Sequence, residues 1–124
     1  MEDQILLHDK FISNEEVKYY FCASNLVAQT YRNATNSGVT MVGYYYEKPM
    51  LVTNVGGLGE IVPNNECGYV VENSVSLISE KILDYFNLNK EEEFTQNVKT
   101  EKKKYEWKEF IRVLIQLFDK TKQD

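Results

Sequence analysis

The stretch KPMLVTNVGGLGEIV, residues 48–62, places an apolar run before a turn with three glycines in four positions. The run at 50–53 follows a proline and predicts a short buried strand. Glycine tolerates positive φ, so Gly56 and Gly57 predict a tight turn, with Glu60 in a short helix after it. The spacing differs from G-x-G-x-x-G, so the pattern by itself indicates a structural turn rather than a phosphate cradle.

Apolar runs and helical patterns alternate on both sides of this turn. Strands are predicted at 5–8, 25–31, 50–53 and 68–72, and helices at 13–21, 39–47, 60–62, 75–86, 89–104 and 105–120. Ser13 and Glu16 predict a capping box, and Asn89 is the expected N-cap of its helix. The alternation predicts an α/β fold, with a Rossmann-like parallel sheet of about four strands flanked by helices.

We expect one domain over residues 1–124, closed by an amphipathic helix at 105–120. The strand at 5–8 is expected to pair directly with the strand at 25–31 or with another chain.

The composition excludes several classes of function. A net charge of −5 argues against general nucleic-acid binding, and a single histidine excludes a His cluster for a metal. No D-x-D pair is present to hold a metal–diphosphate complex, and no apolar run approaches the roughly 20 residues that cross a bilayer. The acidic first ten residues lack the features of a signal peptide, so a cytoplasmic protein is expected. No pair of a nucleophile and a base stands out, which leaves catalytic residues unassigned.

Two polar turns follow neighbouring predicted strands. Residues 32–38 (RNATNSG) follow one strand, and residues 54–59 follow the next. In parallel α/β sheets ligands bind beyond the carboxyl ends of the strands, so the backbone amides of both turns could face one cleft. A helix N-terminus after Gly38 would favour a phosphate or sugar oxygen. The alternative is that Asn36 or Ser37 is simply an N-cap and its neighbours are solvated loop residues.

The residues around the glycine turn resemble a known family. The order S-G, a helix, K-P-M-L-V-T-N-V-G-G-L-G-E-I-V-P and then G-Y-V-V is similar to the carboxyl-terminal half of retaining, GT-B-fold glycosyltransferases. This group of glycosyltransferases (group 1) includes glycogen-synthase-like and sucrose-synthase-like enzymes. The similarity spans nearly all of the chain.

The resemblance implies a function and a set of binding residues. In that family two Rossmann-like domains face each other, and a nucleotide-sugar donor lies mainly against the second. The sugar is transferred with retention, the donor phosphate assists, and no metal or other cofactor is needed. Glu60 matches the glutamate that fixes the glycine turn. The donor-binding residues indicated are Arg32, Thr35, Asn36, Ser37, Gly38, Asn54, Gly56 and Gly57.

The sequence also departs from that family. Two family glutamates, one near the sugar and one near the ribose, fall at Ala34 and Val42 here. The acceptor-binding domain and the first strands of the donor-binding domain have no counterpart in these residues. We therefore expect the chain to supply part of a donor-binding wall, to be inactive alone, and to be completed by the missing amino-terminal portion, another protein or a second copy. The alternative is a non-catalytic α/β binding or interaction module derived from a glycosyltransferase.

Overall fold

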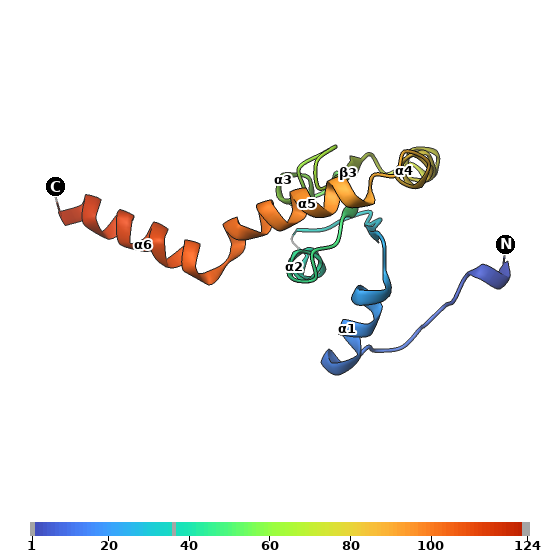
Figure 1. Ribbon diagram of the computed structural model, residues 1–124, viewed down its shortest axis with the longest axis horizontal. Coiled ribbons are helices and arrows are strands. Elements are labelled where there is room, and N and C mark those ends of the chain that lie inside the picture. The colour runs from blue at the N-terminus through green and yellow to red at the C-terminus, as the bar shows by residue number, and fades with distance from the viewer. Residues whose placement is uncertain (1, 36, 123–124) are drawn as a thin grey trace.

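Three parallel strands form the centre of the molecule, and helices pack around them (Figure 1). The computed structural model describes residues 2–35 and 37–122. The elements in chain order are the 3-10 helix η1 (Glu2–Gln4), α1 (Asn14–Ala23), β1 (Val27–Gln29), α2 (Gly38–Tyr45), β2 (Met50–Thr53), α3 (Leu58–Ile61), β3 (Gly68–Val71), α4 (Val75–Asn87), α5 (Glu91–Lys102), the 3-10 helix η2 (Lys103–Tyr105) and α6 (Trp107–Lys122). The expected parallel α/β fold is confirmed.

Strand β2, predicted as a short buried strand, is the middle strand of the sheet. The sheet order is β1-β2-β3, and Met50 lies opposite Val27 on one side and Gly68 on the other. All four residues of β2 are buried. A parallel strand covered on both faces is expected to be apolar throughout, which is why MLVT reads as one continuous run.

The two faces of the sheet carry separate apolar clusters. Met50 and Val52 point to one face, where they pack with residues of α2 and α3. Leu51 points to the other face and packs with residues of β3 and α4. Helix α5 contributes to both clusters, through Val98 to the first and Phe94 to the second. Helix α5 therefore packs against the apolar clusters on both faces of the sheet.

Two buried tyrosines fix the helices to the backbone of other segments. The Tyr44 hydroxyl of α2 donates to the carbonyl of Ile61 at 2.5 Å. The Tyr85 hydroxyl of α4 donates to the carbonyl of Asn25, just before β1, at 2.8 Å. Both rings are almost fully buried, and each hydroxyl has the partner that a buried phenol requires.

The expected first strand is absent from this part of the structure. Residues 5–8 form no strand, and Ile5, Leu6 and Leu7 are 67%, 83% and 87% exposed. They lead away from the sheet to the capping box of α1, which does form as predicted (Figure 1). The sheet of the described residues thus has three strands rather than four, and β1 spans 27–29 rather than 25–31. The expected pairing of 5–8 with the strand at 25–31 is therefore wrong: β1 pairs with β2 alone among the described strands, and an apolar run without a paired neighbour gains nothing from an extended backbone.

The predicted N-cap at Asn89 is also wrong. Asn89 adopts a φ of 49° and ends α4 instead of starting α5. Its amide donates to the carbonyl of Phe86, and the Lys90 amide donates to the carbonyl of Tyr85. This pair of bonds is a Schellman motif, in which asparagine is one of the few side chains that tolerate the left-handed conformation. Helix α5 follows at once, from Glu91 to Lys102, within the predicted 89–104.

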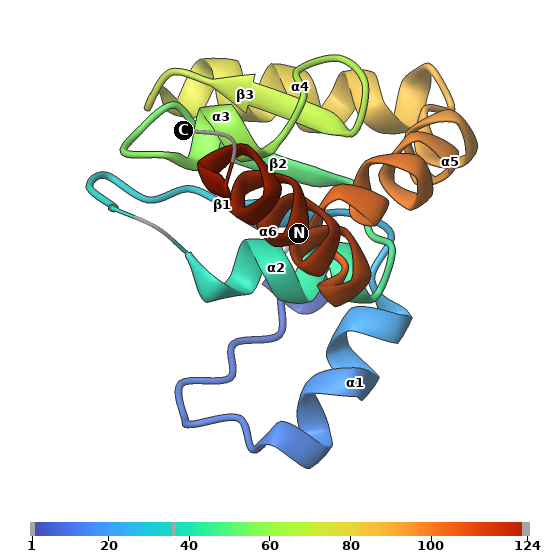
Figure 2. The same ribbon diagram turned by 90° about the vertical axis from the view of Figure 1, so that its left-hand side faces the viewer.

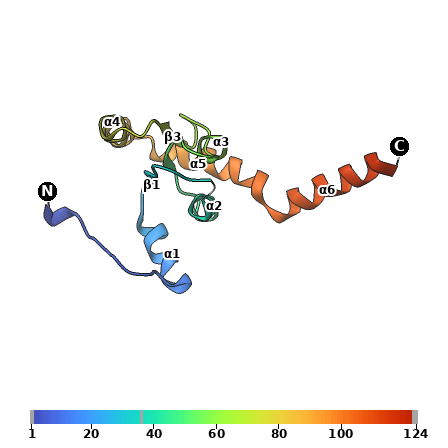
Figure 3. The same ribbon diagram turned by 180° about the vertical axis from the view of Figure 1, so that it is seen from behind.

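The last helix projects from the body of the molecule. It spans 107–122 rather than 105–120, because η2 occupies the residues before it. Figures 1 and 3 show α6 and the segment before α1 pointing to opposite sides. Within residues 2–35 and 37–122 no helix has both the length and the apolar character needed to cross a membrane.

Two buried tyrosine hydroxyls and one buried cysteine thiol predict a loss of stability at alkaline pH. Burial raises the pKa of Tyr44 and Tyr85, and it raises the pKa of the Cys67 thiol to about 11 from an ordinary 9.0. Between pH 9 and 11 the unfolded chain therefore loses the Cys67 proton while the folded chain keeps it. The contribution of the protonated Cys67 thiol to the free energy of unfolding is complete below pH 9 and is lost as the pH rises through 11.

We expect the free energy of unfolding, measured by urea denaturation, to fall across this range, with about 1–3 kcal/mol of the fall due to Cys67. Cys67→Ala should show a smaller fall. Cys22→Ala, which changes the exposed thiol, should match the unmodified chain. An equal fall in Cys67→Ala and the unmodified chain would contradict the assignment.

Candidate functional site

The turns after β1 and β2 meet at the carboxyl edge of the sheet. The Gly57 amide donates to the carbonyl of Thr35 at 3.1 Å. The buried Thr53 hydroxyl, at the end of β2, donates to the carbonyl of Tyr31 at 2.6 Å. Two hydrogen bonds thus hold the two turns side by side, so the residues expected to bind a donor come from adjacent loops.

The contact between the turns depends on a glycine. Gly56 has a φ of 53°, and a Cβ added to it would lie 1.9 Å from the carbonyl oxygen of Ala34. Any side chain at position 56 would therefore clash with backbone, which cannot move aside as a flexible side chain can. The glycines of this turn have a structural purpose, as the pattern predicted, and they bring the backbone of one turn against the other.

The N-terminus of α2 is open at the same edge. Ser37 occupies the N-cap position, but its side chain makes no capping hydrogen bond. Its hydroxyl donates instead to Oε1 of Gln29 at 2.9 Å, and the buried Thr40 hydroxyl donates to the same oxygen at 3.1 Å. The simple capping role considered for Ser37 is therefore wrong. Asn36, the other capping candidate, lies outside the described residues.

Exposed groups surround this helix start. Arg32 and Thr35 are exposed, and a Cβ added to Gly38 would meet nothing within 4 Å. An anion could approach the first amides of α2 closely, because glycine leaves room and the helix dipole is positive there. The arrangement is suited to phosphate or sugar oxygens.

The acidic side chains at this edge limit its positive character. The Asn54 amide nitrogen donates to the Glu72 carboxylate at 3.2 Å, so this part of Asn54 is engaged by the protein. Glu60 is exposed, and its carboxylate bonds to none of the residues that the structure describes. The turn is held by backbone bonds instead, including the Glu60 amide to the Gly57 carbonyl at 3.2 Å.

The positions that replace the two family glutamates carry no polar side chain. Ala34 is half-buried and packs against the first apolar cluster, while its carbonyl faces Gly56. Val42 is half-buried and lines a shallow depression between α1 and α2, together with Val17 and Tyr46. Neither side chain can hydrogen-bond a sugar or a ribose.

Sequence reasoning missed three polar residues that build this edge. Gln29 holds the start of α2, Thr53 joins the two turns, and Glu72 engages Asn54. Gln29 and Thr53 are buried although they are polar. A polar residue at the carboxyl end of a short apolar strand was the available signal, since such a residue requires a partner once it is buried.

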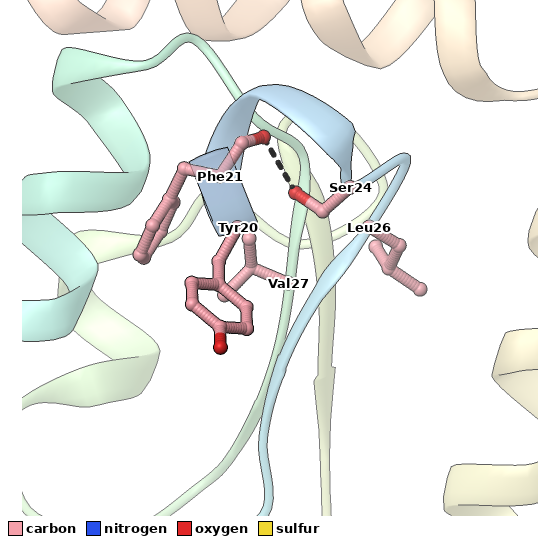
Figure 4. Close-up of a pocket in the computed structure, with 5 residues that line it drawn as sticks. All are labelled: Tyr20, Phe21, Ser24, Leu26 and Val27. Carbon is pink, nitrogen blue, oxygen red and sulfur yellow. Dashed lines mark hydrogen bonds between the residues drawn. The ribbon is translucent and has the colours of Figure 1, made fainter. Parts of the chain in front are cut away.

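An apolar pocket lies at the opposite, amino end of β1 (Figure 4). It is lined by Tyr20, Phe21, Ser24, Leu26 and Val27, and the Ser24 hydroxyl donates to the Phe21 carbonyl at 2.8 Å. The only polar side-chain groups on its walls are the Ser24 hydroxyl, which is engaged, and the Tyr20 hydroxyl. This pocket offers no charge or base to a substrate, and the carboxyl edge remains the candidate site.

No group of three His, Cys, Asp or Glu side chains in the described part of the chain is placed to hold a metal ion. Comparison of this chain with protein families and with curated proteins finds no match to either. The features that bear on function are therefore the carboxyl edge of the sheet and the resemblance in the sequence.

The glycine contact leads to a stability prediction. Gly56→Ala should lower the free energy of unfolding by about 2–4 kcal/mol, because the new methyl group clashes with the Ala34 carbonyl and φ is unfavourable. Gly38→Ala is the matched control: its methyl group meets open space, and alanine favours the helix by up to about 1 kcal/mol. Urea denaturation of both variants measures the difference. Equal stabilities would show that the two turns do not approach each other as described.

Proposed function

We propose that this chain forms part of the donor-binding wall of a retaining glycosyltransferase and that its ligand is a nucleotide-sugar. The observation that supports the proposal most directly is the N-terminus of α2, which no side chain of the described residues caps, beside the glycine turn at the carboxyl edge of a parallel sheet. This is the position at which α/β folds bind phosphorylated ligands. The resemblance in KPMLVTNVGGLGEIV supports a nucleotide-sugar among such ligands.

Each part of the edge has a proposed contact with the donor. The first amides of α2 would donate to diphosphate oxygens, and Gly38 would permit their close approach. Arg32 would add a positive charge near the same oxygens. The exposed Thr35 would hydrogen-bond a sugar hydroxyl. Gly56 and Gly57 would form the floor between the two turns.

The chain alone is proposed to be inactive. Its edge supplies one wall of a cleft, and of the two carboxylates at that edge Glu72 accepts a hydrogen bond from Asn54, while Glu60 is exposed to solvent. In the retaining mechanism that the resemblance implies, the donor phosphate assists departure of the sugar, so the protein's contribution is to position donor and acceptor. The acceptor would be held by a second wall, from an amino-terminal glycosyltransferase portion of the kind that the resemblance implies, another protein or a second copy.

Calorimetry with a panel of nucleoside-diphosphate sugars tests the proposal, with one charge variant and one control. Gly38→Glu places a carboxylate at the open start of α2 and should weaken binding roughly tenfold, because it repels the diphosphate. Val75→Glu places the same carboxylate at the start of α4, where the Ser74 side chain already caps the helix. Val75→Glu should bind as the unmodified chain does.

The contrast between the two variants decides the outcome. Equal weakening in both would indicate a general charge effect and would argue against a site at α2. Failure of every nucleotide-sugar to bind the unmodified chain at millimolar concentration would contradict the proposal.

A second candidate function is a non-catalytic interaction module that kept the fold. The apolar residues Ala34 and Val42 favour it, because they remove two side chains that would hold the donor. A specific protein partner that binds the chain while no nucleotide-sugar does would support this alternative.

A further inference from the structure

Helix α6 has a broad apolar face that is largely uncovered in the described structure, although Trp107 and Phe110 at its start border Met41 of α2. Its apolar residues recur at spacings of three and four, which places them on one side of the helix. The centre of this face consists of Trp107, Phe110, Ile111, Leu114, Leu117 and Phe118. No residue of α6 is buried, and Trp107 and Phe118 are 73% and 63% exposed.

The helix stands apart from the core. Figure 1 shows α6 extending from η2 away from the sheet, and Figure 2, turned by 90°, shows the helix pointing toward the viewer. Both apolar clusters of the core form without it. The core does not need this face for its packing. An exposed apolar face of this size indicates a binding surface.

The charge distribution indicates what could cover this face. Residues 102–122 contain seven Lys or Arg and three Asp or Glu, a net charge of +4, whereas the rest of the chain carries −9. Lys102 and Lys104 pair with Glu47 and Glu101, and α6 itself has four Lys or Arg and two Asp or Glu, a net charge of +2. At 100° per residue, Lys108 and Lys122 flank one side of the apolar face, and Lys120 lies near the other. Glu109 pairs with the guanidinium of Arg112, and Asp119 lies on the same flank as Lys108, so three lysines and one carboxylate are the remaining charges of α6.

We propose that α6 binds the surface of an anionic lipid bilayer, lying parallel to it with its aromatic and aliphatic face in the interface. An amphipathic helix with Trp and Phe on one side and Lys and Arg on the other is suited to this position. The long lysine stems reach along the apolar face and place their ammonium groups at the level of lipid phosphates. Trp107, the first residue of the helix, is suited to the headgroup region of the bilayer.

The same charges disfavour pairing between two copies of α6. Apposed apolar faces would bring the flanking lysines of both helices together, and like charges across such a seam repel. The acidic body does not prevent lipid binding, because a 16-residue helix is about 24 Å long and charges are screened over about 8 Å at physiological salt.

Vesicle binding by the full chain tests this proposal without any nucleotide-sugar, so its outcome is independent of the proposed function. Cosedimentation with vesicles of phosphatidylglycerol and phosphatidylcholine should retain the chain, and vesicles of phosphatidylcholine alone should retain much less. Binding should weaken as the salt concentration rises. Trp107 is the only tryptophan, so its emission should shift to the blue on binding.

Two aspartate variants separate insertion of the apolar face from charge alone. Leu114→Asp lies at the centre of the apolar face and should weaken vesicle binding roughly tenfold or more. Gln116→Asp adds the same charge on the polar face and should weaken binding by a much smaller factor. Circular dichroism of both variants should show the fold intact, since α6 lies outside the core.

Three results would overturn the proposal. The first is absence of binding to anionic vesicles at low salt. The second is equal binding by the Leu114→Asp and Gln116→Asp variants. The third is a combination of two findings: the unmodified chain does not bind vesicles, and light scattering shows a dimer that the Leu114→Asp substitution dissociates. Helix α6 would then be a protein interface.

Discussion

The close approach of Gly56 to the carbonyl of Ala34 is the constraint on which the carboxyl edge of the sheet depends. Only a residue without a side chain fits there, and the left-handed φ of Gly56 turns the chain from β2 into α3. The bonds from Gly57 to Thr35 and from Thr53 to Tyr31 then fix one turn on the other. Because the first of these turns leads into α2, the same contact determines where that helix begins.

This constraint divides the edge into a closed part and an open part. Between the two turns the Gly57 amide donates to the Thr35 carbonyl, so this amide is not available to a ligand. At the start of α2 the Ser37 hydroxyl donates to Gln29, and no side chain among residues 2–35 and 37–122 caps the first amides. An anion that binds this chain would therefore meet the helix first. The carboxylates of Glu60 and Glu72, which follow β2 and β3, disfavour an anion at their part of the edge.

Much of the fold could be predicted from the sequence, because some patterns depend on local chemistry alone. The strand MLVT, the glycine turn and helix α4 are each determined by their own residues, and they form as predicted. The apolar run at 5–8 needed a neighbouring strand, and Asn89 could end one helix as well as begin the next; both predictions were wrong. At the candidate site, the meeting of the two turns followed from parallel topology. The bond from Ser37 to Gln29 did not, because it joins residues whose orientation only the packed structure sets.

The measurement that tests the central claim most directly is a nuclear magnetic resonance titration of the backbone amides with a nucleoside-diphosphate sugar. The account predicts that the largest shifts occur at the start of α2, at Gly38 and Val39, with smaller shifts at Gly56 and Gly57. Shifts confined to the apolar pocket at Tyr20 and Leu26, or no shifts at millimolar ligand, would contradict it.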